Sequence, residues 1–472
     1  MASSPGTPEN PLRVAIVGSG PSGFYTAGHL LKAKDLVVSV DLYDRLPTPF
    51  GLVRAGVAPD HPKIKSVTRV YEKTAAGEGF RFFGNVNVGE HITHHELKER
   101  YHAVIYAVGA ETDRQMDIPG EELPGSWAAT QLVGWYNGHP DYRDLEFDLS
   151  CKRAVVIGNG NVAMDVARML VLPRSELDTT DTADHAIEAF ASCEIEEVVI
   201  VGRRGPAQAA FTNPELLELG ELTDADVVVD PADMHLDHNS LQDIEAEGQL
   251  TARKNVDILT EYSQREPSGK SKRVVLRFLR SPVAIRGEGK VESIDLVRNE
   301  LDHGSDGALR AKATDDHETL ETGIVFRSIG YRGVPVDGVP FDEWKGTIPN
   351  EQGRVVDPHA QHAIPGEYVV GWIKRGPSGV IGTNKRDAQE TVDNLIEDLH
   401  EGRVPEPSGD GSAEAIEALL AERKPEHVTY GGWERIDAVE VAAGESLGRP
   451  RVKLTRVEEM LEAAGKVSAG QS

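Results

Sequence analysis

Residues 13–32 read RVAIVGSGPSGFYTAGHLLK. The apolar run Arg13–Gly18 predicts a short buried strand, and Phe24–Lys32 predicts a helix that follows a glycine turn. The next stretch, Val37–Tyr43, alternates apolar and polar residues like a second strand. Gly18, Gly20 and Gly23 therefore form a GxGxxG pattern between a strand and a helix, which is the context that predicts a βαβ unit binding a dinucleotide.

Each glycine of this turn has its own task. Gly18 makes the tight turn, Gly20 lets a pyrophosphate approach the backbone, and Gly23 lets the helix pack closely on the strand. The start of the helix offers unpaired N–H groups to the phosphates. Asp44 ends the second strand, 26 residues after Gly18, where a carboxylate can accept a hydrogen bond from a ribose 2′-hydroxyl. We expect a dinucleotide with a free 2′-OH here, and a tight turn without a ligand is the alternative.

A second glycine turn begins after Arg153–Gly158 and reads GNGNVA, residues 158–163, before a predicted helix over Asn161–Val171. The later strand, Glu196–Gly202, is followed by Arg203 and Arg204 rather than by a carboxylate. Two guanidiniums suit the additional 2′-phosphate of NADP, which they can bind by charge-assisted hydrogen bonds. Gly158 and Arg203 are 45 residues apart, so we expect residues 173–194 to form an insertion; surface charge is the alternative for the arginine pair.

Several further segments have simple patterns. Tyr101–Ala110 and Gly323–Gly330 look like equivalent strands of the two halves, and two similar layouts imply two α/β domains. We also expect the following: an irregular loop over Leu46–Pro62, strands over Val256–Leu259 and Val274–Leu279, a polar link over His303–Glu318, and a helix over Glu414–Arg423.

The overall composition excludes several classes of protein. The 472 residues carry a formal net charge of −27, which disfavours nucleic-acid binding, and the chain contains no apolar run long enough for a membrane helix. Cys151 and Cys193 are the only cysteines, which excludes a disulfide scaffold and a cysteine-ligated cluster. We expect no metal site. Met1–Pro11 has no apolar core and reads as a flexible tail rather than a signal peptide, so we expect a cytoplasmic protein.

The stretch Tyr368–Thr383 reads YVVGWIKRGPSGVIGT. It predicts a strand, a glycine-rich turn and a helix that starts near Asn384 with Thr383 as its cap. The start of that helix could face the pyrimidine side of a flavin and favour its reduced form. Trp372 is expected either to contact the flavin or to fill the core.

Four stretches, in this order, resemble the adrenodoxin-reductase-like ferredoxin–NADP⁺ reductases, especially the actinobacterial members. They are LPTPFGLVRAGVAPDHPKIK (residues 46–65), GNGNVAMDVAR (158–168), VGRRGP (201–206) and GWIKRGPSGVIGTNK (371–385). The likeness extends from about Arg13 to Leu399 and more loosely to Leu454. It implies FAD in the first domain, NADP in the second, and electron exchange with a ferredoxin, a small acidic iron–sulfur protein.

The resemblance also implies site residues, matched position by position. FAD contacts would come from Ser22, Asp44, Leu52, Val88, Trp372 and the backbone of Gly379, Val380 and Ile381, in addition to Gly18, Gly20 and Gly23. NADP contacts would come from Arg114, Asn159, Gly160, Asn161, Val162, Arg203, Arg204, Glu215 and Gly379. His61 and Glu218 match the pair that the family places near the nicotinamide. Asp44 stands where close relatives often carry Glu, so its ribose contact could be shorter or water-mediated.

We therefore predict an α/β protein with two Rossmann-like dinucleotide-binding domains, for FAD and NADP, arranged as in glutathione reductase. The predicted segments are a tail (1–11), the FAD-binding domain in two parts (12–112 and 333–399), the NADP-binding domain (113–332) and a C-terminal helical extension (400–472) with a mainly solvated acidic face. The cofactors carry the redox chemistry, in which a hydride passes from NADPH to FAD and electrons leave singly.

The predicted enzyme is a ferredoxin–NADP⁺ reductase that acts as a monomer or weak dimer. The alternatives are an NADPH-input module of a larger complex, like the small subunit of glutamate synthase, a general NADPH diaphorase, and a non-catalytic nucleotide-binding protein. Because the chain is acidic, docking of an acidic ferredoxin requires a local basic patch. Its candidate residues are Lys63, Lys65, Arg69, Lys374, Arg375, Lys385 and Arg386.

Overall fold

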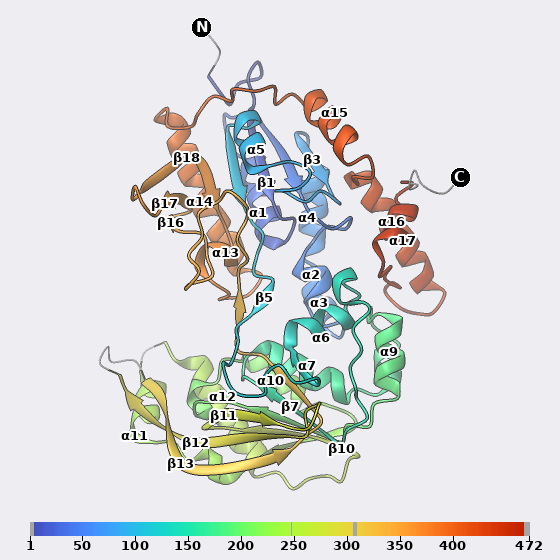
Figure 1. Cartoon of the computed structure of the whole chain (residues 1–472), viewed down its shortest axis with the longest axis vertical. Coiled ribbons are helices and arrows are strands. Elements are labelled where there is room, and N and C mark those ends of the chain that lie inside the picture. Colours follow the sequence, from blue (N-terminus) through green and yellow to red (C-terminus); the bar gives the residue numbers. More distant parts are fainter. Residues whose placement is uncertain (1–3, 247, 305–308, 467–472) are drawn as a thin grey trace. The chain divides into compact units, whose positions relative to one another are not determined.

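The computed structural model describes residues 4–246, 248–304 and 309–466. The chain forms two compact units, of which the first comprises residues 1–112, 137–140 and 331–472 and the second residues 113–136 and 141–330 (Figure 1). The chain passes between them four times, and two of these crossings lie at β5 (Thr112–Asp113) and next to β15 (Tyr331–Arg332), two short strands that pair with one another. Each unit is described by itself below.

The first unit is built on a seven-stranded sheet in the order β16-β17-β18-β4-β1-β2-β3. The parallel part consists of β18 (His362–Val369), β4 (Ala103–Tyr106), β1 (Leu12–Val17), β2 (Val38–Tyr43) and β3 (Phe80–Phe83), and β17 (Arg354–Asp357) and β16 (Asn350–Glu351) continue it antiparallel. In this register Val17 pairs with both Tyr43 and Tyr106. The carboxyl ends of β1, β2 and β4 therefore lie at one edge, which is where open parallel sheets bind ligands.

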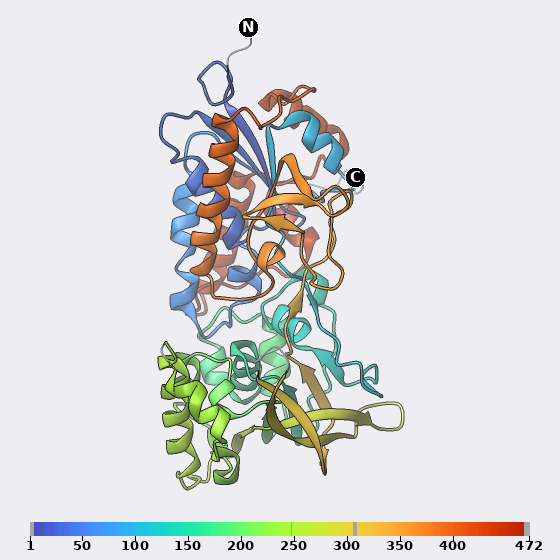
Figure 2. The same cartoon turned by 90° about the vertical axis from the view of Figure 1, so that its left-hand side faces the viewer.

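Alternate residues of β1 pack into two cores, one on each face of the first sheet. Val14 and Ile16 belong to the core that includes residues of α1 (Pro21–Leu30) and α14 (Thr383–His400), whereas Ala15 and Val17 belong to the opposite core. Figure 2 shows α14, α1 and α4 (Thr68–Ala75) side by side along the first face. The first unit also contains α2 (Leu52–Ala55), α3 (Pro62–Lys65), α5 (His94–Arg100) and α13 (Trp372–Arg375).

Residues 400–466 form three helices that belong to both cores of the first unit. They are α15 (Ala413–Arg423), α16 (Tyr430–Glu445) and α17 (Val457–Ala463). Ile416 and Leu420 of α15 contribute to the core that contains Ala15, while Trp433 and Ile436 of α16 contribute to the core that contains Val14. Residues 4–11 also contact this unit, because the N–H of Val37 donates to the carbonyl of Gly6 at 2.8 Å.

The second unit is built on a six-stranded parallel sheet in the order β6-β14-β7-β8-β10-β9. The strands are β6 (Ser126–Ala128), β14 (Ile324–Arg327), β7 (Arg153–Ile157), β8 (Glu197–Val201), β10 (Lys272–Arg277) and β9 (Ala225–Val229). Helices cover one of its faces, including α7 (Asn161–Val171), α10 (Asn213–Leu219) and α12 (Leu250–Ser263). The other face is covered by an antiparallel sheet of β11 (Arg280–Arg286), β12 (Ser293–His303) and β13 (Leu309–Glu321). The remaining helices are α6 (Ala129–Tyr136), α8 (Arg174–Leu177), α9 (Asp184–Ala191) and α11 (His238–Glu245), with 3₁₀ turns η1 (Pro140–Tyr142), η2 (Pro206–Gln208) and η3 (Pro231–Met234).

Three local predictions are wrong, each for a physical reason. Val256–Leu259 lies inside α12 and is not a strand, because Asn255, Ile258, Leu259 and Tyr262 are buried with the period of a helix. The polar segment 309–318 is not a link but part of β13, which gains its backbone pairing from β12. The stretch 46–62 contains α2, closed by the N–H of Ala55 donating to Gly51. The insertion over 173–194 is present, as predicted, and forms α8 and α9.

No helix among the described residues is long and apolar enough to cross a membrane.

Candidate nucleotide-binding sites

The first glycine turn contains three glycines. At two of them the fold leaves no room for a Cβ, and at the third it does. Gly18 has a φ of +106°, and a Cβ there would lie 2.5 Å from the carbonyl oxygen of Ala107. A Cβ on Gly23 would lie 2.1 Å from the carbonyl oxygen of Gly18. By contrast, a Cβ on Gly20 would meet nothing closer than the Cα of Gly51 at 4.0 Å. The space above Gly20 is therefore open, which fits the close approach of a pyrophosphate.

Asp44 is held beside this turn by donors from both of its sides. Its Oδ2 accepts from the N–H of Ser19 at 2.9 Å and from the Ser19 hydroxyl at 2.5 Å, and its Oδ1 accepts from the N–H of Leu46 at 2.9 Å. Burial raises the pKa of Asp44, and these hydrogen bonds oppose part of that rise. Because each carboxylate oxygen can accept two hydrogen bonds, Oδ1 retains a lone pair that a ribose hydroxyl can use.

The turn also meets α2 and the segment after β18. A Cβ on Gly51 would lie 2.9 Å from the Cα of Gly20, and a Cβ on Gly371 would lie 2.2 Å from the Oγ of Ser22. Leu52 opens α2 and exposes 38% of its surface. Val88 follows β3, bridges to Ile92 and packs against the core that contains Tyr43.

Trp372 has a polar atom that the described chain leaves unsatisfied. Its ring stacks on Tyr331 with centroids 5.3 Å apart, and its buried Nε1 has no hydrogen-bond partner among the described residues. A buried indole N–H is normally paired, so this orphaned donor fits a bound ring with acceptor atoms. This observation and the open space at Gly20 together fit FAD in the first unit.

The glycine-rich turn after Trp372 is fixed by a residue that the sequence analysis missed. Asp387 of α14 accepts from the N–H of Gly371 at 2.5 Å and forms ion pairs of 3.0 Å with both Lys374 and Arg375. Gly379 has a φ of +81°, and Val380 is 58% exposed, with Ile381 packing partly on the core. Thr383 is the first residue of α14 and not its cap; its hydroxyl accepts instead from the N–H of Val380 at 3.2 Å. No sequence motif or hydrophobic pattern marks Asp387 as different from the other acidic residues of this helix.

These ion pairs correct part of the predicted docking patch. Lys374 is only 7% exposed and also pairs with Glu390 at 2.6 Å, so Lys374 and Arg375 serve the turn and not the surface. Lys63, Arg69, Lys385 and Arg386 are exposed.

In the second turn, too, the first glycine has no room for a Cβ and the middle glycine faces open space. Gly158 has a φ of +125°, and a Cβ there would lie 2.0 Å from the carbonyl oxygen of Ser328. A Cβ on Gly160 would meet nothing within 4 Å. Asn161 is tied to the fold, because its Oδ1 accepts from the N–H of Thr212 at 2.8 Å, and Val162 packs partly on the core. The buried Nδ2 of Asn159 has no partner among the described residues, so this turn offers both open space and a free donor.

Arg203 and Arg204 follow β8 beside this turn. Their backbone is fixed, because Asn299 Nδ2 donates to the carbonyl of Arg203 at 2.8 Å and the N–H of Leu279 donates to that of Arg204 at 3.1 Å. Neither guanidinium forms an ion pair with any residue that the structure describes. Burial, and then the charge of Arg203, lower the pKa of Arg204. Two adjacent cations without an ion-pair partner among the described residues fit the 2′-phosphate of NADP.

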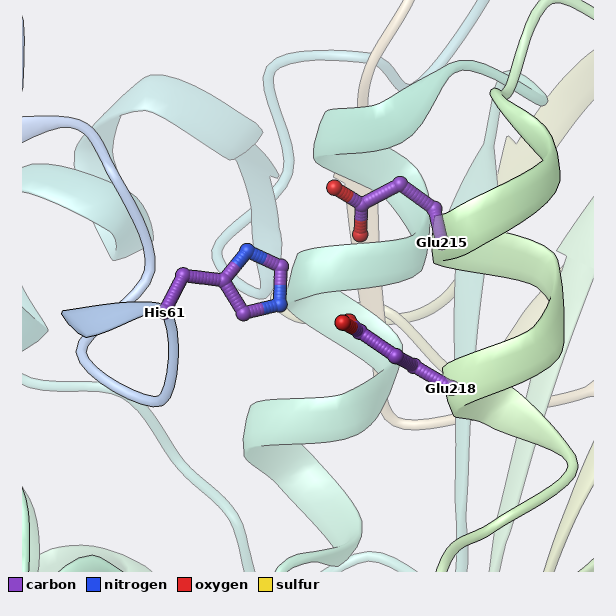
Figure 3. A group of neighbouring side chains, drawn as sticks. All are labelled: His61, Glu215 and Glu218. Atoms are coloured by element: carbon purple, nitrogen blue, oxygen red, sulfur yellow. The ribbon is translucent and has the colours of Figure 1, made fainter. Parts of the chain in front are cut away.

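The acidic residues of α10 surround a buried arginine that was not predicted. Arg168 of α7 donates to Glu215 at 2.9 Å and to Asp165 at 2.6 Å, and it lies 4.0 Å from Glu218. Glu215 is buried and Glu218 is 45% exposed in its side chain. Figure 3 shows that both glutamates extend from α10. Arg114 lies on the same unit, where its N–H donates to the carbonyl of Gly330 at 3.0 Å.

His61, the third side chain labelled in Figure 3, belongs to the first unit and directly precedes α3. Its Nε2 lies 3.9 Å from Oδ1 of Asp60, a neighbour that the sequence analysis did not single out.

A cleft of about 1060 Å³ in the second unit lies at the opposite edge of the sheet, at the amino ends of β7, β8, β9 and β10. Several of its charged side chains pair with one another: Glu197 binds Arg153 and Arg273, and Lys152 pairs with Glu196 at 3.0 Å. The carboxyl edge remains the candidate nucleotide site, because the open glycine turn and the unpartnered Nδ2 of Asn159 lie there.

Comparison with known proteins agrees with this geometry. Residues 12–205 match the family model described as pyridine nucleotide-disulphide oxidoreductase. NADPH-ferredoxin reductase FprA of Mycobacterium tuberculosis is 54% identical over 458 residues, which cover 96% of this chain and 98% of that protein. Human mitochondrial NADPH:adrenodoxin oxidoreductase is 44% identical, covering 97% of this chain and 93% of that protein.

The chain belongs to the adrenodoxin-reductase-like ferredoxin–NADP⁺ reductases. Within this reductase family, a solved structure of Mycobacterium tuberculosis FprA in complex with NADPH has a TM-score of 0.91 at 53% identity, covering 96% of this chain and 100% of that chain. The probable ferredoxin/ferredoxin–NADP reductase of Mycobacterium bovis is 43% identical and covers 96% of this chain and 76% of its own length.

Proposed function

We propose that this chain is an NADPH-dependent FAD flavoprotein that transfers electrons between NADPH and a ferredoxin-type iron–sulfur protein. One observation carries the proposal: the two open glycine turns are followed by opposite charges. The first turn has the fixed carboxylate of Asp44, and the second has the unpaired guanidiniums of Arg203 and Arg204. The first therefore suits the ribose of FAD and the second the 2′-phosphate of NADP.

The bound cofactors supply the hydride and single-electron chemistry, and the chain supplies binding and orientation. In the first unit, Gly20 leaves room for the pyrophosphate, Asp44 accepts from the ribose, and Trp372 Nε1 donates to the flavin. Asp387 holds the Gly371–Arg375 segment so that Trp372 keeps its place. In the second unit, Asn159 donates from its free amide while the arginine pair binds the 2′-phosphate.

His61 and Glu218 keep the roles predicted for them as proposals. We assign His61 to orienting the nicotinamide carboxamide or tuning the flavin, supported by its neighbour Asp60 at 3.9 Å. We assign Glu218 to the nicotinamide on its resemblance to the family's pair; its side chain is 45% exposed, and it lies 4.0 Å from Arg168, which binds Glu215 at 2.9 Å. A His61→Gln substitution should change the rate of flavin reduction while leaving the content of FAD unchanged.

A ferredoxin as the partner is supported by the names of the relatives, one of which pairs ferredoxin with ferredoxin–NADP reductase. Exposed cations on α3, α4 and α14, namely Lys63, Arg69, Lys385 and Arg386, are available for an acidic surface. We propose that the protein docks this partner as a monomer or weak dimer.

The deciding experiment is anaerobic stopped-flow mixing of the purified yellow protein with NADPH and then with ferredoxins of the same organism. The proposal predicts bleaching of the oxidised flavin by NADPH, much slower bleaching by NADH, and re-oxidation by a ferredoxin. A colourless protein, or a flavin that NADPH leaves oxidised, would contradict it. Re-oxidation by ferricyanide but by no ferredoxin would identify a general diaphorase instead.

A further inference from the structure

Glu440 of α16 is a fully buried carboxylate in an extension whose acidic residues were expected to face solvent. Its exposed fraction is 0%. Arg54 donates to it through both ends of its guanidinium, from Nη1 to Oε2 at 2.8 Å and from Nη2 to Oε1 at 2.5 Å. The N–H of Leu454 adds a donor at 2.9 Å and Arg451 adds one at 3.2 Å. Burial by itself would raise the pKa of Glu440, but the guanidiniums outweigh it and hold the pKa below its ordinary value.

Arg54 lies in α2 and connects that helix to the C-terminal extension. It is 386 positions away from Glu440 in the chain. Its guanidinium lies over the ring of Trp433, 5.3 Å from the centroid. Its backbone carbonyl accepts from Nζ of Lys453 at 3.2 Å. The C-terminal extension therefore contacts both the side chain and the backbone carbonyl of Arg54.

The other side of the same segment touches the first glycine turn. Phe50 has a φ of +84°, a conformation that is costly for a bulky residue and that persists only where its surroundings enforce it. Its N–H donates to the carbonyl of Ser19 at 3.0 Å, and its ring meets Trp433 edge-on at 5.6 Å. Gly51 approaches Gly20, and Leu52 follows as a predicted FAD contact.

We propose that Glu440 is a positioning residue of the FAD site, which fixes Arg54 and thereby holds the Phe50–Leu52 backbone against the Ser19–Gly20 turn. The inference rests on the proposed function, because it takes FAD as the group in that turn. A buried bidentate pair is well suited to this task, since removing Glu440 takes away the carboxylate that both ends of the Arg54 guanidinium bind and lets the segment shift. The helices of residues 400–466 then support the flavin site rather than forming a separate appendage.

The test is a double-mutant cycle on FAD affinity in the full-length chain. Glu440→Gln, Arg54→Gln and the double variant are compared with Glu434→Gln, an exposed glutamate on the same helix. The Kd for FAD is measured by ultrafiltration well below the unfolding temperature, together with the visible spectrum of the bound flavin and the Kd for NADP⁺.

Each single variant should raise the Kd for FAD about tenfold, and the double variant should raise it no further, because both changes break one interaction. The Kd for NADP⁺ should stay at the wild-type value, which a general loss of structure would not allow. Glu434→Gln should match the wild type in every measurement.

A folded Glu440→Gln protein with the wild-type Kd for FAD would overturn the inference, as would additive effects in the double variant. Should Glu440→Gln not fold, Arg54→Lys decides: it keeps a cation opposite Glu440 but loses the two-pronged contact, and an unchanged Kd for FAD would overturn the inference. A wild-type protein that binds no FAD would overturn the proposed function itself.

Discussion

The glycine turns of the two units have the same backbone design and opposite charges beside it. In both, the first glycine has a positive φ and abuts the carbonyl of the residue that follows a neighbouring strand, while the middle glycine faces open space. Beside the first turn, the carboxylate of Asp44 is already bound by Ser19 and Leu46. Beside the second, Arg203 and Arg204 have no ion-pair partner among the described residues. The glycines thus mark where a pyrophosphate fits, and the charge after the strand decides which dinucleotide it belongs to.

The largest effect should come from filling the open space of one turn at a time. Gly20→Val should fold, because its Cβ would meet nothing closer than the Cα of Gly51 at 4.0 Å, yet purify without FAD. Gly160→Val should remain yellow and fail to be reduced by NADPH. Gly18→Val is the contrasting control, since its Cβ would lie 2.5 Å from Ala107 and should prevent folding. A Gly20→Val protein with normal flavin content, measured from its absorbance, would contradict the assignment of FAD to the first turn.

The arginine pair should produce the next largest effect. In the Arg203→Ala/Arg204→Ala variant each lost charge-assisted contact costs about 1.5–3 kcal/mol, so kcat/KM for NADPH should fall about 10²-fold or more. NADH has no 2′-phosphate, and its kcat/KM should be nearly unchanged. Steady-state reduction of ferricyanide measures both values. A fall for NADPH of less than tenfold would remove the pair from the NADP site.

Asp44→Asn should raise the Kd for FAD about tenfold at neutral pH. The amide N–H₂ of Asn would face N–H and O–H groups from which the carboxylate accepts hydrogen bonds. The difference should depend on pH in a defined direction. Burial raises the pKa of Asp44 above its ordinary 3.8, so the wild type loses its advantage as the pH falls through that raised value. Measured Kd values for FAD should therefore converge for the two proteins in acid and diverge toward neutral pH. A difference in Kd that stays constant as the pH falls to the acid limit of the folded protein would exclude Asp44 as the titrating acceptor.

The smallest effect should come from exposed cations that lie outside both nucleotide-binding turns. Arg386→Glu should lower the rate of ferredoxin reduction about threefold at low salt, and raising the salt should remove the difference, because screening weakens exposed charges. Ferricyanide reduction should not change. Lys312→Glu, an exposed cation on β13, is the matched control. Equal losses in both assays would show that Arg386 acts on the protein itself and not on docking.

Much of the backbone of each turn and its flanking strand and helix could be predicted, because it depends on local rules. The strand, the glycine spacing and the helix of 13–32 lie within one short segment, and so do residues 153–171. The error at Val256–Leu259 arose because a four-residue apolar run fits a strand or a buried helix equally well, and only the burial of Asn255 and Tyr262 on the same face decides.

The supporting residues could not be predicted, because their partners are distant in the chain or chemically ambiguous. Arg54 and Glu440 meet across 386 positions, and no spacing rule connects them. Lys374 and Arg375 look like surface cations in the sequence, and only the position of Asp387 on the next helix shows that they are structural. Asp387 in turn resembles any acidic residue of an exposed helix.

A crystal structure of the purified chain grown with NADP⁺ would show which dinucleotide each glycine turn binds. We expect FAD in the first unit, with its pyrophosphate over Gly20 and a ribose hydroxyl on Asp44, and the 2′-phosphate of NADP⁺ held by Arg203 and Arg204. A structure with the 2′-phosphate bound elsewhere, or with FAD in the turn at Gly160, would contradict it.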